Sequence, residues 1–409
     1  MNGSTTNGTK KENFHVLIIG AGTTGLSVAQ GLKTHGIPFT VFERQDVGKY
    51  VNWQREWSMG FHWGSNYIDH WPQKLQDNVW TTQNDPNAKM TEEQDHFIPI
   101  KNGKTGELVV KVPSETVRRV SRTKLRLLLS TDIDVQYGKK FLKLDDHGDK
   151  ITAYFEDGTT AEGNVVIGCD SVHSKVREAV LSPEKINLEH VPVTIFNLTQ
   201  QFTREQAKFI RSFEHPWLLI GVHPDQPMLA FINIANVKES DKPESVVFQM
   251  LYSKWGGSTP DTNEERHRVF KELGQQLCEP FKSASAWVKE DTWIHPDHLT
   301  HWPKPEKWDN HGGRITLAGD AAHPMAPYRG QGLNNALEDA SYYIKAITSA
   351  VEGKKSLSEA VDAYDAEVLE RGRREIDVSY KQAVAFHNFE MMQNSTIARH
   401  GTAKVAAAN

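Results

Sequence analysis

The sequence predicts an α/β fold, in which a Rossmann-like nucleotide-binding domain is interrupted by a β-rich insert and followed by C-terminal helices. Residues 14–20 form a near-continuous apolar run, typical of a strand covered on both faces in a parallel sheet. A glycine-rich turn, a segment with helical spacing of apolar residues (26–36) and a second apolar run (38–44) follow. This is the order of a βαβ unit. The middle of the chain instead has β-rich runs separated by turn residues, as in an antiparallel sheet.

The other elements are predicted from the same patterns. Strands are expected at 134–146, 150–163, 164–170, 216–224, 227–237, 245–255 and 313–320. Helices are expected at 115–130, 264–289 and through most of 333–389. The two ends of the chain therefore form one nucleotide-binding unit around the insert.

Composition excludes several function classes. With 409 residues, 38% of them hydrophobic, the chain can bury a sizeable core. A net charge of -5 offers no broad basic field, so we expect no nucleic-acid partner. The two cysteines, Cys169 and Cys278, suggest no disulfide framework. No apolar run reaches the roughly 18 residues of a membrane span, and residues 1–12 lack an export signal, so we expect a soluble, cytoplasmic protein.

The glycine-rich turn has the G-x-G-x-x-G spacing of a dinucleotide site. Gly20 permits a tight turn, Gly22 lets the backbone approach a pyrophosphate, and Gly25 allows the helix to pack closely on the strand. Glu43 ends the second strand about 20 residues later, where a carboxylate suits free ribose hydroxyls and repels a 2′-phosphate. Glycine-rich turns also occur for structural reasons alone, but the flanking strand and helix favour FAD or NAD binding here.

Residues 314–340, RITLAGDAAHPMAPYRGQGLNNALEDA, resemble the second FAD fingerprint of the aromatic-hydroxylase class of flavoprotein monooxygenases, which includes para-hydroxybenzoate hydroxylase. The resemblance implies a GR2-type FAD domain. It places Asp320 at the ribityl chain of the flavin. It also places Gly330 and Gly332 at a helix start whose amides face the flavin's pyrimidine edge.

Two further segments extend the resemblance. Residues 164–178 resemble the family's middle motif, in which Asp170 contributes to cofactor binding. Ser171 stands where the family has glycine, and a serine restricts the backbone conformations that this turn can adopt. Residues 120–129 resemble the helix whose arginine, here Arg122, reaches the FAD phosphates. An isolated helical arginine would otherwise suggest only a solvated face. Arg44 follows Glu43, the carboxylate expected to bind the ribose, and is also predicted to belong to the cofactor site.

With this resemblance the chain divides into five stretches. We expect a disordered tail at 1–12, a first FAD-binding part at 13–180 and a β-rich substrate domain at 181–290. A second FAD-binding part at 291–345 and a C-terminal helical region at 346–409 complete the chain.

The family's chemistry implies that NAD(P)H reduces FAD and that O2 then forms a flavin C4a-hydroperoxide, which hydroxylates an electron-rich aromatic or enolic small molecule. Pro327 matches the proline beside the flavin, and Tyr328 and Arg329 follow it, where a cation can stabilise an oxyanion. His62 lies in a segment that in the family passes near the active site, where imidazole can take a phenolic proton. Arg329 as a plain salt bridge and His62 as a filler of a polar gap are the alternatives. The residues HWGS (62–65) and APYRGQGLN (326–334) resemble fungal enzymes that tailor polyketides, which predicts a role in secondary metabolism.

Other functions remain open at this point. A same-fold epoxidase, a Baeyer–Villiger-type oxygenase or an oxidase would carry the same cofactor motifs. An NAD-dependent dehydrogenase would explain the first turn but not the segment around Asp320, and a non-catalytic flavin-binding module would explain every motif. His295, His298 and His301 recur at a spacing of three but lack the frame of a zinc site, so no metal is predicted. The oligomeric state and the substrate's identity stay unpredicted.

Overall fold

Five parallel strands form the central sheet, sheet A, in the order β19-β11-β1-β2-β7. The computed structural model describes residues 13–51, 56–213, 215 and 217–404, so the predicted tail at 1–12 lies outside the described residues. Every residue of β1, β11 and β19 is buried, which explains their near-continuous apolar sequences. The strands are β1 (Val16–Ile19), β2 (Phe39–Glu43), β7 (Val135–Tyr137), β11 (Val165–Gly168) and β19 (Ile315–Leu317).

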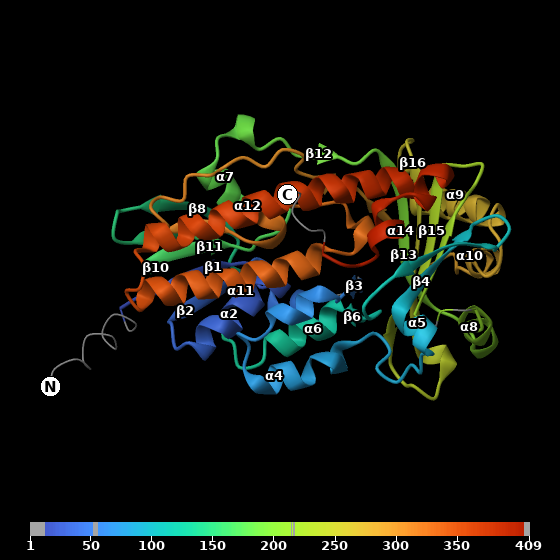
Figure 1. The fold of residues 1–409 in the computed structure, drawn as a ribbon, viewed down its shortest axis with the longest axis horizontal. Coiled ribbons are helices and arrows are strands. Elements are labelled where there is room, and N and C mark those ends of the chain that lie inside the picture. Colours follow the sequence, from blue (N-terminus) through green and yellow to red (C-terminus); the bar gives the residue numbers. More distant parts are fainter. Residues whose placement is uncertain (1–12, 52–55, 214, 216, 405–409) are drawn as a thin grey trace.

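Helices cover sheet A and link it to the rest of the molecule. The longer ones are α2 (Thr23–Thr34), α6 (Arg122–Leu129), α11 (Gly332–Val351) and α12 (Leu357–Phe386). Helix α2 packs against α11 and α6. Helix α12 begins with a capping box at Ser356 and runs beside α11 across the molecule (Figure 1).

Short helices occupy the connections. They are α3 (Val47–Val51), α4 (Gln73–Asn78), α5 (Glu92–His96), α7 (Lys175–Val180), α13 (Phe389–Gln393) and α14 (Thr396–His400). The single-turn helices are η1 (Trp63–Tyr67), η2 (Val79–Thr82), η3 (Pro183–Lys185), η4 (Pro243–Ser245), η5 (Gly319–Ala321) and η6 (Pro327–Arg329).

Small antiparallel units flank the main sheets. Strands β8 (Phe141–Asp146), β9 (Ile151–Phe155) and β10 (Thr160–Gly163) form a meander. Strand β3 (Ser58–Gly60) pairs with β6 (Arg119–Ser121), and β12 (Glu189–His190) pairs with β18 (Thr300–His301).

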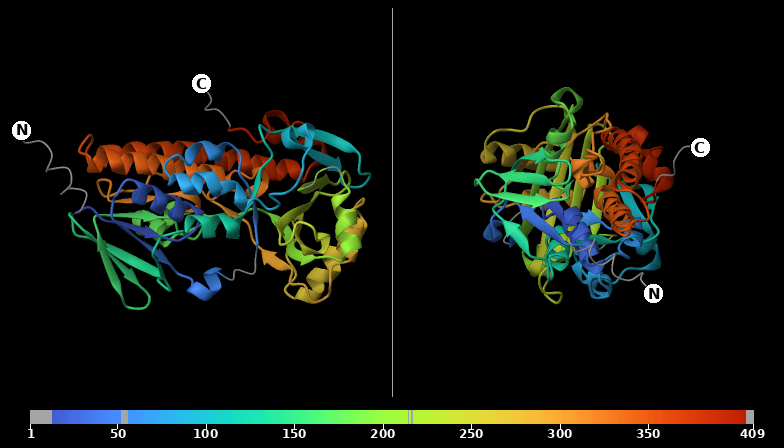
Figure 2. Two further views of the ribbon diagram at one scale, coloured as in Figure 1. Left: turned by 90° about the horizontal axis from the view of Figure 1, so that it is seen from below. Right: turned by 90° about the vertical axis from the view of Figure 1, so that its left-hand side faces the viewer.

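The predicted β-rich insert forms most of a seven-stranded sheet, sheet C, in the order β17-β13-β16-β15-β14-β4-β5. Its strands are β4 (Phe97–Asn102), β5 (Leu108–Pro113), β13 (Val193–Gln201), β14 (Leu218–Val222), β15 (Met228–Val237), β16 (Val246–Trp255) and β17 (His295–Asp297). The helices on its outer face are α8 (Arg204–Arg211), α9 (Asn263–Gln275) and α10 (Phe281–Ala286). Figure 2 shows sheets A and C at opposite ends of an elongated molecule, with α11 and α12 along one side.

Sheet C does not coincide with the predicted limits of 181–290. Strands β4 and β5 come from 97–113, inside the stretch assigned to the first FAD-binding part, because β4 pairs in parallel with β14. Strand β17 lies beyond residue 290 at the opposite edge. The β4–β14 and β13–β17 pairings join residues about 100 to 120 positions apart, which local patterns do not reveal.

The helix predicted at 115–130 is also corrected. Residues Arg119–Ser121 form strand β6 on β3, and only the following stretch is helical. The Ser121 hydroxyl accepts a hydrogen bond from the Lys124 amide and starts α6 at this point.

Candidate active site

The predicted cofactor motifs meet at the carboxyl-terminal edge of sheet A. A side chain at Gly20 would overlap the Cys169 carbonyl after β11, and one at Gly319, after β19, would meet Thr24 of the glycine-rich turn. Strands β19, β11 and β1 are neighbours, so three motifs far apart in the sequence become adjacent. Ligands of open α/β sheets bind at this edge.

The glycine-rich turn has the geometry of a phosphate cradle. Gly20 adopts a φ of +108°, and a side chain at Gly25 would overlap the Gly20 carbonyl oxygen. No atom lies within 4 Å of the position that a side chain of Gly22 would take, so the start of α2 is open to a ligand.

Glu43 and Arg44 lie on opposite sides of the end of β2. The buried Glu43 carboxylate accepts hydrogen bonds from the amides of Ala21 (3.0 Å) and Gln45 (2.9 Å). It therefore holds the glycine-rich turn against β2. Arg44 is exposed. The ribose and cofactor roles of both residues remain predictions.

Helix α6 places two arginines at the cofactor edge. Arg122 is its first residue. Restricted hydration raises the pKa of Asp320, and the charge of Arg122 partly offsets this effect. Arg126 is buried one turn later, with its guanidinium 3.6 Å from the centre of the Tyr50 ring. The Tyr50 hydroxyl donates to the Ala21 carbonyl (2.6 Å), so Arg126 lies against the glycine-rich turn. Arg126 is not among the residues that the sequence motifs predict to bind the cofactor.

Asp170 has a structural role at the start of α7. Its Oδ2 accepts hydrogen bonds from the Lys175 amide (2.7 Å) and the Val176 amide (3.2 Å) at the start of α7. Its Oδ1 is buried, and no described residue gives it a hydrogen bond. Ser171 adopts a φ of +75°, the left-handed conformation for which the family uses glycine. The turn is therefore kept despite the substitution.

A buried ionic cluster holds the loop that carries Asp320. Asp339 on α11 accepts hydrogen bonds from the Gly319 amide (2.6 Å) and Arg371 (2.5 Å), and its Oδ2 lies 2.7 Å from His323 Nε2. The Asp320 side chain is exposed beside this cluster. The surrounding protein restricts its hydration and raises its pKa. No described residue donates a hydrogen bond to Asp320, which leaves both oxygens available to a ribityl chain.

The segment from Pro327 to Gly332 forms an open wall of the site. Pro327 is exposed and starts η6, and Gly330 ends it with a φ of +65°. Side chains at Gly330 and Gly332 would meet no atom within 4 Å, so the first amides of α11 can be reached by a ligand.

Tyr328 and Arg329 are tied into the protein on the other side of this segment. Arg329 is buried and donates from Nη1 to Glu375 (2.7 Å), so its charge is compensated. Its Nε and Nη2 donate no hydrogen bond to any described residue. Tyr328 lies edge-on to His387, and burial raises the pKa of its hydroxyl. The salt bridge considered as an alternative role for Arg329 is therefore present, with Glu375 as its partner. The catalytic roles of Tyr328 and Arg329 remain predictions.

His62 reaches the same segment from β3. A side chain at Gly60 would meet both His62 Nε2 and the Gly330 carbonyl, so His62 and Gly330 are close. The Asn334 side chain on α11 accepts hydrogen bonds from the amides of His62 (2.9 Å) and Gly64 (3.0 Å) and fixes the loop.

The His62 imidazole is neutral and oriented. Burial lowers its pKa from 6.5 to about 4. Its Nδ1 lies 3.4 Å from the Thr116 carbonyl, and a carbonyl only accepts, so Nδ1 carries the hydrogen and Nε2 keeps its lone pair. This arrangement leaves Nε2 unprotonated at neutral pH, with its lone pair available as an acceptor.

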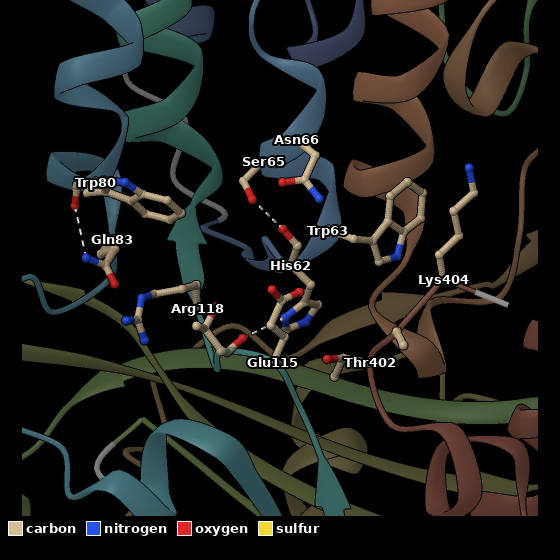
Figure 3. Close-up of a pocket in the computed structure, with 12 residues that line it drawn as sticks. His62, Trp63, Ser65, Asn66, Trp80, Gln83, Glu115, Arg118, Thr402 and Lys404 are labelled. Carbon is tan, nitrogen blue, oxygen red and sulfur yellow. Dashed lines mark hydrogen bonds between the residues drawn. The ribbon is translucent and has the colours of Figure 1, made fainter.

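A cavity of about 560 Å³ opens beside His62 (Figure 3). Trp63 and Trp80 lie on either side of His62, and Lys404 comes from the end of the described chain. Arg118 borders the cavity and is paired with Asp95. Its size and indole rings suit a small, flat molecule.

The inner face of sheet C, opposite α9 and α10, is partly polar. Along β16, Phe248 and Met250 pack with the outer helices, whereas Gln249 and Ser253 point inward. Ser253 forms a 2.8 Å hydrogen bond with His387 at the end of α12. The odd-numbered residues of β16, such as Gln249 and Ser253, therefore face the nucleotide-binding half.

A chain of buried amides crosses this inner face. Asn233 donates to Gln249 (2.9 Å), Gln249 to Asn197 (3.0 Å), and Asn197 to Asp297 (3.0 Å). Asn233 Oδ1 is buried without a hydrogen bond from any described residue. The inner face can therefore offer polar contacts to a bound molecule.

Comparison with known proteins identifies the family. Residues 76–379 match the model of the FAD binding domain family. The FAD-dependent monooxygenase phnB of Penicillium herquei is 33% identical over 95% of this chain and 94% of its own length. The chain belongs to the FAD-dependent monooxygenases. The predicted family, fold class and FAD cofactor are confirmed, and the dehydrogenase alternative is set aside.

Two more distant relatives extend the comparison. The 6-hydroxynicotinate 3-monooxygenase of Pseudomonas fluorescens is 23% identical, with 89% of this chain and 90% of that protein covered. The crystal structure of Klebsiella pneumoniae HpxO complexed with FAD and uric acid has a TM-score of 0.73 at 18% identity, covering 96% and 93% of the two chains. The latter likeness supports the fold.

The residues present fit FAD. The open glycine-rich turn and Arg126 suit the pyrophosphate, while Asp320 suits the ribityl chain and the amides at Gly330 suit the flavin ring. Within the described ranges, no group of three or more potential ligands could hold a metal ion, and no helix is long and apolar enough to cross a membrane.

Proposed function

We propose that this monooxygenase uses NAD(P)H and O2 to hydroxylate an electron-rich aromatic or enolic small molecule of the secondary-metabolite type. One oxygen atom enters a C–H bond of the substrate, and the other leaves as water with the two electrons of NAD(P)H. Bound FAD supplies this redox chemistry. The protein's own part is to bind, orient and deprotonate the substrate.

The neutral His62 beside Gly330 carries the proposal. Loss of the phenolic or enolic proton makes the adjacent carbon more electron-rich, and His62 Nε2 keeps a lone pair that can take that proton. The Gly330 carbonyl is close to this nitrogen, so the base lies where the flavin ring is expected.

The surroundings support a flat and polar substrate. Trp63 and Trp80 flank His62 in the cavity, and the amide chain offers hydrogen bonds across the inner face of sheet C. The 6-hydroxynicotinate 3-monooxygenase takes, by its name, a hydroxylated aromatic ring. A substrate of this chemical type is therefore the first to test.

Spectroscopy and isotope labelling test the proposal. We expect the purified protein to be yellow and to release FAD on denaturation. NADPH or NADH should bleach the flavin without O2 in the presence of a substrate. With 18O2 and a panel of polyketide phenols, one product should gain a single labelled oxygen atom.

Two outcomes would contradict the proposal. Hydrogen peroxide formed in equal amount to the NAD(P)H consumed with every phenol would indicate an oxidase. Label from H2(18)O rather than 18O2 in the product would exclude oxygen transfer.

A further inference from the structure

Arg119 is a half-buried cation between the two halves of the molecule. It lies on β6, and its guanidinium is 5.5 Å from the centre of the Phe231 ring on the inner face of sheet C. Its Nε donates to the Ser58 hydroxyl (2.7 Å) and its Nη2 to the Ser58 carbonyl (2.9 Å). These two hydrogen bonds to Ser58, the first residue of β3, fix the position of the Arg119 guanidinium.

The charge of Arg119 is not compensated. No carboxylate among the described residues forms an ion pair with it, and burial lowers its pKa from 12.5 to about 10. Both partners on Ser58 are neutral. Arg119 is half-buried, and a cation with limited access to water and no counter-charge is stabilised when an anion binds.

The neighbouring arginines differ in this respect. Arg118, which borders the cavity beside His62, pairs with Asp95, and Arg329 pairs with Glu375. No described carboxylate pairs with Arg126 either, but it lies against the glycine-rich turn, where the pyrophosphate of bound FAD would supply the negative charge. Arg119 precedes the motif arginine Arg122 by three residues and lies beside Phe231 of sheet C, in the substrate half.

We propose that Arg119 is the anion-recognising residue of the substrate site and selects an aromatic molecule that carries an oxyanion, a carboxylate or a phenolate. This inference rests on the proposed function and names its substrate class. Phe231 supplies an apolar surface beside the cation, and Ser58 holds the guanidinium so that its remaining donors face the ligand. The His62 base lies close enough for the Arg119 charge to lower the pKa of His62, so a substrate oxyanion would be formed and held in one place.

A pair of isosteric probes tests the assignment on the FAD-loaded protein. Benzoate carries the charge, and benzamide has nearly the same shape without it. Their affinities for the oxidised protein are measured from the change in flavin absorbance at neutral pH. We expect the wild-type protein to prefer benzoate at least about tenfold, because hydrogen bonds between charged groups are stronger than those to a neutral amide.

The variants separate charge from structure. Arg119→Gln should lose at least about tenfold in benzoate affinity and keep its benzamide affinity, whereas Arg119→Lys should keep part of the preference. Arg204→Gln, which removes an exposed arginine paired with Glu244 on sheet C's outer side, should match the wild type.

Three results would overturn the inference. They are failure of benzoate to bind the wild-type protein, equal benzoate affinity in Arg119→Gln, and a shifted flavin midpoint potential with an unchanged benzoate preference. The last would assign Arg119 to the flavin instead. The benzoate and benzamide affinities are measured without turnover. Failure of oxygen transfer would therefore contradict the proposed function without changing what these affinities say about Arg119.

Discussion

Ser171 shows how one residue can keep a turn at a conformational cost. Its φ of +75° is in the left-handed region, which costs an L-residue about 1–2 kcal/mol. Asp170 before it binds the start of α7, so the turn cannot relax without losing those two hydrogen bonds. The departure from the family's glycine therefore alters stability and leaves the turn in place.

Replacing Ser171 with glycine should raise the free energy of unfolding by up to about 1 kcal/mol, because relief of the strain exceeds the extra entropy of the unfolded chain. Urea unfolding of the FAD-loaded protein measures the change. Ser212→Gly is the matched control, since Ser212 has a φ of -77° and gains nothing from glycine. An unchanged or lower urea midpoint for Ser171→Gly would show that the turn is unstrained.

His62 predicts a pH dependence that differs from that of an ordinary histidine. Because its folded pKa of about 4 is below the unfolded value of 6.5, the unfolded chain takes up the proton first. Its contribution to stability is therefore complete above pH 6.5 and falls as the pH drops toward 4, by about 1.4 kcal/mol per unit. His62→Gln should be less sensitive to acid than the wild type when urea unfolding is compared at pH 7 and pH 5.

The same residue should control turnover. His62→Gln should lower kcat by about 10²–10⁴-fold, because the phenolic proton loses its acceptor. FAD content should stay the same. In the wild type, the acid limb of the kcat/KM profile should follow a group with a pKa near 4. An acid limb near 6.5, or full activity in His62→Gln, would assign deprotonation to another group.

At the scale of elements, α11 and α12 hold the flavin loop through buried charge. Burial alone would raise the pKa of Asp339, but His323 and Arg371 hold it below its usual range. Asp339→Asn breaks this cluster and should lower the free energy of unfolding by about 3–5 kcal/mol. It should also weaken FAD binding, because Asp339 holds the Gly319 amide next to Asp320.

Equilibrium dialysis of FAD and urea unfolding check this prediction together. Glu370→Gln, an exposed carboxylate on the same α12, is the control and should leave both values unchanged. Normal FAD affinity in a destabilised Asp339→Asn protein would show that the cluster supports the fold alone.

Elements that depend on contiguous patterns could be predicted from the sequence. The strand, glycine-rich turn and helix at 14–34 follow from apolar runs and G-x-G-x-x-G, and residues 314–340 follow from a long ordered motif. The position of Arg119 in the site could not be predicted, because it depends on contacts with Ser58 and Phe231, which lie 61 and 112 positions away. The helix predicted over 115–130 included Arg119 and hid the β6 strand that positions it.

The whole molecule is joined by features that no local pattern contains. Helix α12 has 30 residues, which corresponds to about 45 Å. Near its start Tyr364 donates to the Leu317 carbonyl of sheet A (2.9 Å), and just beyond its end His387 contacts Ser253 of sheet C. Strands β4 and β5 cross from the nucleotide-binding half into sheet C. The two halves therefore stabilise one another.

This architecture predicts that residues 181–290 do not fold alone. The fragment lacks β4, β5 and β17, so both edges of its sheet are unpaired and the inner side chains such as Phe231 are left in water. We expect poorly dispersed amide resonances and weak β-sheet circular dichroism, whereas the full chain gives a folded spectrum. A well-dispersed spectrum with a cooperative thermal transition would show that the insert is an independent domain and that β4 and β5 only decorate its edge.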